Sequence, residues 1–199
     1  NLLIAFYGAT LAKRVWIAAL ETEMNITAVR DKQPEFFHLC SSIFTYVFKS
    51  KRFETIVETP FSKQTKSDII RYSLNRGRTT EDLLRSTTSC YDGTTHNCGK
   101  CSTCFKRWVA MTNNNIKEVY DSNPVFSNNY AKKIMGEMFS CVVNKKTNPR
   151  FSNKRIQETF SALHTYFKGI DEIPVDLVQI SGIYYSRAAF LAILETGSL

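Results

Sequence analysis

The chain lacks a long apolar run, a signal peptide and a glycine-rich loop. None of its 199 residues lie in a stretch that approaches the roughly 18 apolar residues of a membrane helix. The segment 2–11 is too short for that and has neither the charged start nor the cleavage site of a signal peptide. We therefore expect a cytoplasmic protein without a membrane partner. The chain opens on Asn1 rather than methionine, so we also expect further sequence before it.

The six cysteines are too unevenly placed for a secreted disulfide framework. Four of them fall within residues 90–104, whereas Cys40 and Cys141 stand alone. Secreted disulfide scaffolds spread their cysteines along the chain and are usually smaller. The clustered cysteines therefore predict metal ligands.

The four clustered cysteines have the spacing Cys90-x7-Cys98-x2-Cys101-x2-Cys104. Two overlapping C-x-x-C steps bring three thiols into one tight turn, and a loop through Asp92-Gly93 returns the fourth. Zinc prefers four soft ligands in a tetrahedron, and a site with four protein ligands is closed and structural. An iron–sulfur cluster or a redox disulfide relay is the alternative.

Two further residues of the cysteine segment, Gly99 and His96, bear on the metal site. Gly99 lets the backbone approach the metal closely. His96 lies inside the loop and is a candidate to replace one thiol, but with four cysteines present we interpret it as a loop residue.

The net charge of +8 leaves the question of a nucleic-acid partner open. A basic excess favours anionic partners such as nucleotides, nucleic acid or phosphate. A generally basic surface that keeps the protein in solution explains the charge equally well.

Helical and strand patterns alternate in the first half of the chain. We predict a buried helix over 2–13, a buried strand over 15–20, an amphipathic helix over 35–48, a strand over 54–59 and a helix that opens at 65–68. The stripe of helix 35–48 comprises Phe36, Leu39, Cys40, Ile43 and Val47, so Cys40 is a core residue. This alternation predicts an α/β layer with a parallel sheet.

The second half is mostly helical. We predict helices over 102–112, 129–143, 154–168 and 184–194, the third with a stripe of Ile156, Phe160, Leu163 and Phe167. We expect residues 1–112 to form an α/β domain that includes a zinc knuckle at 88–107, and residues 113–199 to form a helical extension.

Several motifs together resemble one enzyme family. Residues 88–91 (TSCY), 98–104 (CGKCSTC) and Arg107 resemble the C-terminal zinc motif of the 7-cyano-7-deazaguanine synthases, ATP-dependent enzymes of the queuosine pathway. Upstream, Asn1 with its apolar helix, Asp31 with the stretch 34–36, and the helix start at 65–69 resemble further family segments in the same order. The resemblance covers about the first 110 residues.

The resemblance implies a fold and an activity. The fold is a Rossmann-like parallel layer of the adenine nucleotide α-hydrolase type, with zinc as a structural ion. The activity converts 7-carboxy-7-deazaguanine, ammonia and ATP, with magnesium, into the nitrile through an adenylated carboxylate and an amide. The family's ATP loop, S-G-G-x-D-S, is absent from the sequence, and the residues beyond the knuckle resemble nothing that we can place.

Five residues besides the cysteines are candidates for binding substrate or ATP, and no catalytic residue is assigned. Lys66 at a helix start suits phosphate or a substrate carboxylate, and Arg107 suits a substrate carboxylate or the zinc thiolates. Asp31 and Glu35 suit the base edge, and Glu21 suits base or ribose. Each also has an ordinary alternative, such as a surface lysine, a solvated loop carboxylate or a helix-dipole contact.

Three functions follow from these patterns. The first is a 7-cyano-7-deazaguanine synthase, an ATP-dependent C–N ligase that acts on a deazaguanine substrate. The second is a repurposed, non-catalytic relative, a zinc-stabilised subunit whose residues 113–199 dock a protein partner; the missing ATP loop favours it. The third is an unrelated zinc module that binds nucleic acid, supported mainly by the charge. Whether the chain forms a homodimer stays open.

Overall fold

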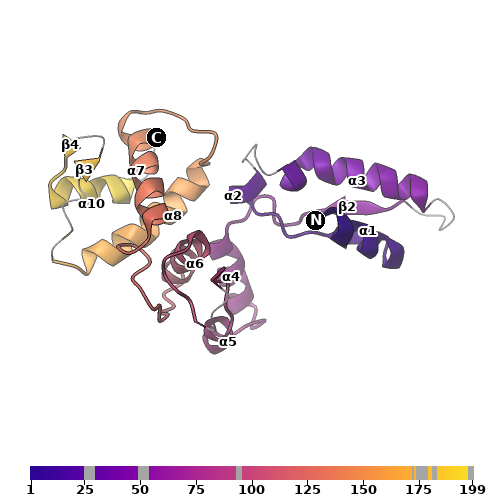
Figure 1. Cartoon of the computed structure of the whole chain (residues 1–199), viewed down its shortest axis with the longest axis horizontal. Coiled ribbons are helices and arrows are strands. Elements are labelled where there is room, and N and C mark those ends of the chain that lie inside the picture. Colours follow the sequence, from indigo (N-terminus) through magenta and orange to yellow (C-terminus); the bar gives the residue numbers. More distant parts are fainter. Residues whose placement is uncertain are drawn as a thin grey trace. The chain divides into compact units, whose positions relative to one another are not determined.

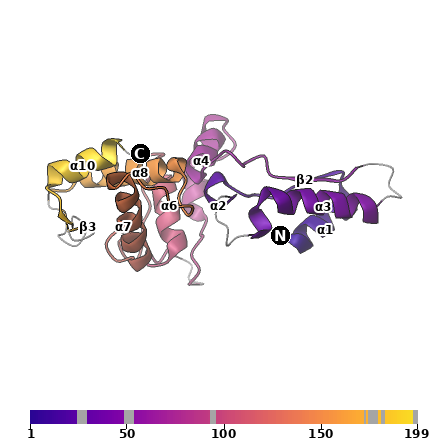
Figure 2. The ribbon, with the colours of Figure 1, turned by 90° about the horizontal axis from the view of Figure 1, so that it is seen from above.

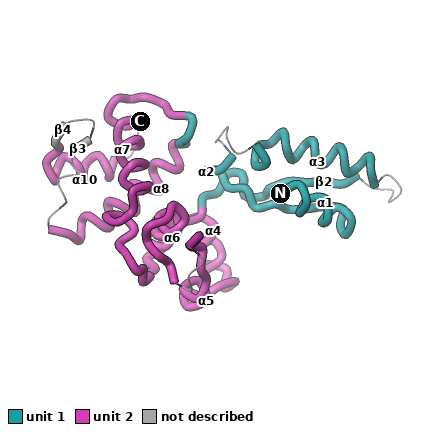
Figure 3. The backbone as a smooth tube through the Cα atoms, in the orientation of Figure 1, with its two compact units in different colours: residues 1–65, 149–152 teal, residues 66–148, 153–199 magenta. Residues whose placement is uncertain are grey.

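The computed structural model describes residues 1–24, 30–48, 54–92, 96–171, 173, 179–180 and 183–196 (Figure 1). These residues form two compact units (Figure 3). Unit 1 comprises residues 1–65 and 149–152, and unit 2 comprises residues 66–148 and 153–199.

Unit 1 is built from helices around a small parallel sheet. Its elements are α1 (Leu2–Leu11), β1 (Arg14–Trp16), α2 (Glu21–Met24), the 3-10 turn η1 (Arg30–Lys32), α3 (Pro34–Val47) and β2 (Ile56–Glu58). β1 and β2 pair in parallel, with Val15 opposite Val57. The predicted parallel sheet is therefore confirmed, but both strands are shorter than the predicted ranges 15–20 and 54–59 because ladder pairing joins only three residues of each.

Helix α1 packs its small residues inward and leaves its large ones exposed. Ala5 and Ala9 are fully buried in the core of unit 1, whereas Leu3 is 82% exposed. A Cβ atom on Gly8 would lie 2.8 Å from Cγ1 of Val15, so only glycine lets this turn of α1 approach β1. The prediction of a buried helix is thus wrong for its large side chains.

Helix α3 begins and ends within one residue of the predicted range, but part of its buried face differs. Cys40 is 2% exposed, as predicted, and lies in the core with Phe37 and Phe44. The side chains of Leu39, Ile43 and Val47 are more than half exposed, so the predicted stripe is wrong at these positions. The reason is that α3 packs on β2 and α1 (Figure 2). The residues that it buries in the core there are Phe37, Cys40 and Phe44.

Unit 2 is mostly helical. Its elements are α4 (Lys66–Asn75), α5 (Glu81–Ser86), α6 (Ser102–Thr112), α7 (Asn129–Val143), α8 (Asn153–Lys168), β3 (Gln179–Ile180), β4 (Ile183–Tyr184) and α10 (Arg187–Thr196). Helix α8 packs on α6 and α10, and α6 packs on α4. The predicted stripe of α8 is confirmed, since Ile156, Phe160, Leu163 and Phe167 are all at most 1% exposed.

Aromatic rings join helices α7, α8 and α10 into one core. The Phe139 ring lies 4.7 Å from Phe160 and 4.9 Å from Phe190, measured between ring centroids. These rings come from α7, α8 and α10, so the three helices share buried surface. None of the described helices has the length and apolar character that crossing a membrane requires.

Candidate metal centre

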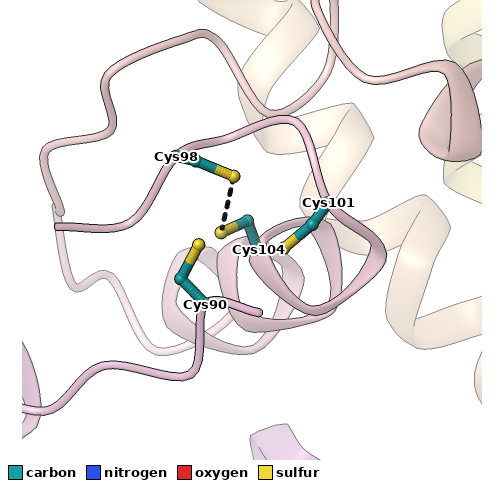
Figure 4. Close-up of side chains that lie close together, drawn as sticks. All are labelled: Cys90, Cys98, Cys101 and Cys104. Carbon is teal, nitrogen blue, oxygen red and sulfur yellow. Dashed lines mark hydrogen bonds between the residues drawn. The ribbon is translucent and has the colours of Figure 1, made fainter. Parts of the chain in front are cut away.

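The four predicted cysteines converge at the start of helix α6. Their Sγ atoms all lie within 4.8 Å of one another, and those of Cys98 and Cys104 are 3.9 Å apart (Figure 4). Cys101 is the N-cap of α6, Cys104 lies in its first turn, and Cys90 and Cys98 come from the preceding loop. The cluster is half enclosed, because Cys98 and Cys104 are buried and the other two are partly exposed.

Local backbone geometry explains why this spacing closes into a cluster. Gly99 adopts a left-handed φ of 75°, which turns the chain between Cys98 and Cys101. The amide of Lys100 donates a hydrogen bond to Cys98 Sγ at 3.3 Å, a contact that suits a thiolate. His96 is exposed and is not part of the cluster. The predicted turn at Asp92-Gly93 lies partly outside the described residues.

Burial raises the pKa of two thiols of the cluster. The pKa of Cys98 rises to about 11, first through burial and then through the side chain of Asp92. Burial also raises the pKa of Cys104. Without a metal, both therefore hold their protons at neutral pH.

Hydrogen bonds lower the pKa of the other two thiols. Burial alone would raise the pKa of Cys101, but the Thr103 hydroxyl, 3.0 Å from its Sγ, and nearby backbone amides outweigh that and lower it to about 6. Backbone groups of Cys98 and then Asp92 lower the pKa of Cys90. The cluster thus presents thiolate character on its exposed side.

The geometry suits a single metal ion. A tetrahedral ion with metal–sulfur bonds of about 2.3 Å places its sulfur ligands about 3.8 Å apart. The 3.9 Å between Cys98 and Cys104 is close to that separation, and no pair exceeds 4.8 Å. The four thiols can therefore hold a metal ion.

Arg107 lies one turn beyond the cluster and is engaged with protein groups. Its Nε donates to both carboxylate oxygens of Glu118, at 2.9 and 3.0 Å. Its Nη1 donates to the Thr87 hydroxyl, and its Nη2 donates to the Leu84 carbonyl. The side chains of Arg107 and Glu118 are only 10% and 3% exposed. The pair joins α6 to the end of α5 and to the segment that follows α6.

The three acidic candidates lie in unit 1, and no described contact joins them. Glu21 begins α2, and its Oε2 accepts a hydrogen bond from the Ser152 hydroxyl at 2.8 Å. Asp31 accepts one from the Asn1 side chain at 3.0 Å. Glu35 is exposed in the first turn of α3.

Lys66 begins α4, where the next residue already binds a carboxylate of the chain. The amide of Ser67 donates to Glu158 Oε1 at 3.0 Å, and the Ser67 hydroxyl donates to the same oxygen. Asn113 donates to the Glu158 carbonyl at 2.8 Å. Among the described residues, the N-terminus of α4 thus binds the carboxylate of Glu158.

Sequence reasoning missed several residues that shape the site. Two of them contact the knuckle from beyond it in the chain: Glu118 binds Arg107, and Asn128 binds the carbonyl of Gly99. The third, Glu158, binds Ser67 at the start of α4. Only Asn128 has a sequence signal, since asparagine before a predicted helix is typical of an N-cap. That signal predicts its bond to Ala131 but not its bonds to the knuckle.

The α-rich chain with a small parallel sheet and four converging thiols is an α/β protein with a cysteine cluster that can hold a metal ion. Within that class, the chain belongs to the family described as "Queuosine biosynthesis protein QueC", whose model matches residues 1–115. The family implies an adenine nucleotide α-hydrolase-like fold.

Curated relatives carry the name 7-cyano-7-deazaguanine synthase. The chain is 28% identical over 122 residues to the protein of Sulfolobus acidocaldarius. This match covers 59% of this chain and 25% of that protein. It is 38% identical over 82 residues to the protein of Archaeoglobus fulgidus, and this match covers 41% of this chain and 32% of that protein. It is 31% identical over 111 residues to the protein of Ruegeria sp., and the match covers 52% of this chain and 45% of that protein. The chain thus spans a quarter to less than half of the length of these relatives. No solved structure matches it.

Proposed function

We propose that these residues belong to a 7-cyano-7-deazaguanine synthase-like protein. The reaction consumes 7-carboxy-7-deazaguanine, ammonia and ATP with magnesium, and it forms the nitrile. The observation that supports this proposal is the family match over residues 1–115, which includes all four clustered cysteines. In this interpretation residues 1–112 form the C-terminal part of the synthase domain, and residues 113–199 form its helical extension.

In this proposal Cys90, Cys98, Cys101 and Cys104 hold a structural zinc ion. Zinc with four thiolate ligands has no open position for substrate, so it cross-links the loop to α6 and does not act as a Lewis acid. An iron–sulfur cluster fits less well. Its thiolates bind different irons with sulfides between them, whereas four sulfurs within 4.8 Å leave room for one ion.

The described residues provide no complete site for ATP. The amide of Ser67 at the start of α4 donates to Glu158, and Arg107 is paired with Glu118. The eight glycines of the chain are scattered along the sequence, so no glycine-rich motif for binding phosphate is present in it. We therefore assign no step of ATP chemistry to these residues, and the proposed activity requires a phosphate loop supplied by other sequence of the whole protein.

The test uses the complete gene product that contains these residues. Elemental analysis should show one zinc per chain. Incubation with ATP, ammonia and 7-carboxy-7-deazaguanine should then yield the nitrile and AMP, detected by mass spectrometry. A zinc-loaded, folded protein that forms neither product would overturn the catalytic proposal.

The second candidate is a non-catalytic relative that keeps the knuckle as a zinc-stabilised scaffold for a partner. It is favoured by the engagement of predicted binding residues with the chain itself: Glu21 with Ser152, Asp31 with Asn1, and Arg107 with Glu118. This candidate predicts one zinc per chain, no nitrile and no AMP. The same experiment therefore separates the two functions.

A further inference from the structure

A short segment beyond the family match lies directly against the metal-binding turn. The amide of Asp121 donates to the carbonyl of Asn97 at 3.1 Å. The carbonyl oxygen of Ser122 is so close to Gly99 that a Cβ atom there would lie 1.7 Å from it. Since the family model ends at residue 115, these contacts come from a part of the chain that it does not describe.

Asn128 makes the most specific of these contacts. Its Nδ2 donates to the carbonyl of Gly99 at 3.1 Å and to that of Cys101 at 2.8 Å. Its Oδ1 accepts a hydrogen bond from the amide of Ala131 at 3.1 Å and so caps helix α7. The residue is 0% exposed, and all three of its side-chain bonds are made inside the protein.

We propose that Asn128 is a positioning residue for the metal centre, and that the segment 121–128 holds the metal-binding turn in place. The carbonyls of Gly99 and Cys101 belong to the peptide planes between Cys98 and Cys104. Holding both planes fixes the directions in which these cysteines point their sulfurs. Groups that orient metal ligands in this way typically change metal affinity by about 10–100-fold when they are removed.

The proposal also links metal loading to the extension. The same carboxamide orders the metal-binding turn through its nitrogen and the start of α7 through its oxygen. Filling the metal site therefore stabilises α7, and a well-formed α7 strengthens the metal site, because the two equilibria share one side chain. This inference rests on the proposed zinc site.

The test compares Asn128→Ser with Asn144→Ser in the full chain. Serine keeps an N-cap oxygen for the amide of Ala131 but cannot reach the two carbonyls, and it adds no charge. Asn144 lies at the other end of α7, is exposed, and donates to the Ser140 carbonyl, so it controls for loss of an asparagine donor. Zinc affinity is measured by competition with a chromophoric chelator, and the thiolate-to-metal absorption of Co²⁺ reports the geometry of the site.

We expect Asn128→Ser to weaken zinc binding about 10-fold or more and to alter the Co²⁺ spectrum, with Asn144→Ser unchanged. A merely structural role for Asn128 would lower the melting temperature of the metal-free and loaded forms equally and leave the spectrum intact. Unchanged affinity in Asn128→Ser overturns this inference, whereas a wild-type chain that binds no zinc overturns the proposed zinc site itself.

A second measurement needs no variant and covers the case in which Asn128→Ser does not fold. Hydrogen exchange of the unmodified chain is followed with and without zinc. Zinc should slow exchange of the amides of Asp121 and Ala131 at least about 10-fold, the size of the affinity change expected for Asn128→Ser. It should leave exchange of the Val57 amide, in β2 of unit 1, nearly unchanged. Equal exchange of Asp121 and Ala131 in both forms contradicts the proposal.

Discussion

At the scale of single residues, the buried pair of Arg107 and Glu118 supports a structural role for the arginine. All three guanidinium nitrogens donate to groups of the chain, and both partners are nearly inaccessible to solvent. A guanidinium engaged in this way is held in place by the chain and is nearly closed to solvent. Its role in this structure is to join α6 to the segments on either side of it.

Arg107→Ala is therefore expected to destabilise the protein strongly. Removing one partner of a buried ion pair leaves the other charge without compensation, which typically costs about 3–5 kcal/mol. Arg85→Ala is the matched control, because the ion pairs of Arg85 with Glu81 and Asp82 lie on the surface and contribute at most about 1 kcal/mol. Chemical denaturation measures both free energies of unfolding. If Arg107→Ala kept wild-type stability and lost only substrate binding, the result would support the substrate-binding interpretation instead.

The pKa values of the cysteines predict how zinc affinity depends on pH. Without metal, Cys98 has a pKa of about 11 and that of Cys104 is also raised, whereas Cys101 has a pKa of about 6. Near neutral pH, Cys101 is thus already a thiolate, and Cys98 and Cys104 each release a proton when they bind zinc. Because binding releases protons, the affinity rises with pH.

Release of at least two protons, from Cys98 and Cys104, makes the zinc affinity rise by at least about 100-fold per pH unit between about pH 7 and pH 8.5. Chelator competition across this range measures the slope. Calorimetry in buffers with different enthalpies of protonation counts the protons independently. An affinity that does not change with pH would mean that the thiols are already ionised or that they do not bind the metal.

The residues of the metal cluster were predictable, and most of their partners were not. The four cysteines lie within one short segment, so their spacing alone indicates that their sulfurs meet. The partners Glu118 and Asn128 follow the cluster in sequence, and their contacts depend on the path of the chain after α6. No local pattern encodes that path, so the sequence did not indicate that Arg107 pairs with Glu118.

At the scale of elements, helix α1 is unusual because its small residues face the core. Ala5 and Ala9 are fully buried, while Leu2, Leu3 and Ile4 are more than half exposed. The sequence predicted the helix itself but not this orientation, because an apolar residue stands at almost every position and no polar face marks the outside. Where a polar face exists, as in α8, both the helix and its buried stripe were predicted.

Gly8→Ala and Gly136→Ala are expected to change stability in opposite directions. A Cβ atom on Gly8 would lie 2.8 and 3.1 Å from the two methyl carbons of Val15, and a valine side chain has little freedom to move away. We expect a loss of about 1–3 kcal/mol from this overpacking. Nothing lies within 4 Å of a Cβ atom on Gly136 in α7, so alanine there should add up to about 1 kcal/mol through helix propensity.

Denaturation curves of the two variants and the wild type provide the measurement. Gly8 lies in unit 1 and Gly136 in unit 2, so each variant should shift the transition of its own unit. A stabilising Gly8→Ala would show that α1 does not pack on β1 as closely as described.

At the scale of the whole molecule, each compact unit contains one buried cysteine outside the metal cluster. Cys40 lies in the core of unit 1 and is 2% exposed, and Cys141 lies in unit 2 on α7 and is 6% exposed. Burial raises the pKa of both thiols, so both react slowly with alkylating reagents while their units are folded. The two thiols therefore report the local stability of the two units separately.

Removal of zinc is expected to expose Cys141 much more than Cys40. The metal cluster belongs to unit 2, where α6 packs directly on α7, so losing the cross-link lowers the stability of that unit first. If the metal contributes about 3 kcal/mol to unit 2, the open state in which Cys141 reacts becomes about 100-fold more populated. Alkylation with and without a chelator, quantified by mass spectrometry of the two cysteine peptides, gives both rates in one sample. Equal acceleration at Cys40 and Cys141 would mean that the chain unfolds as one cooperative body, and no acceleration at either would mean that the cluster carries no structural metal.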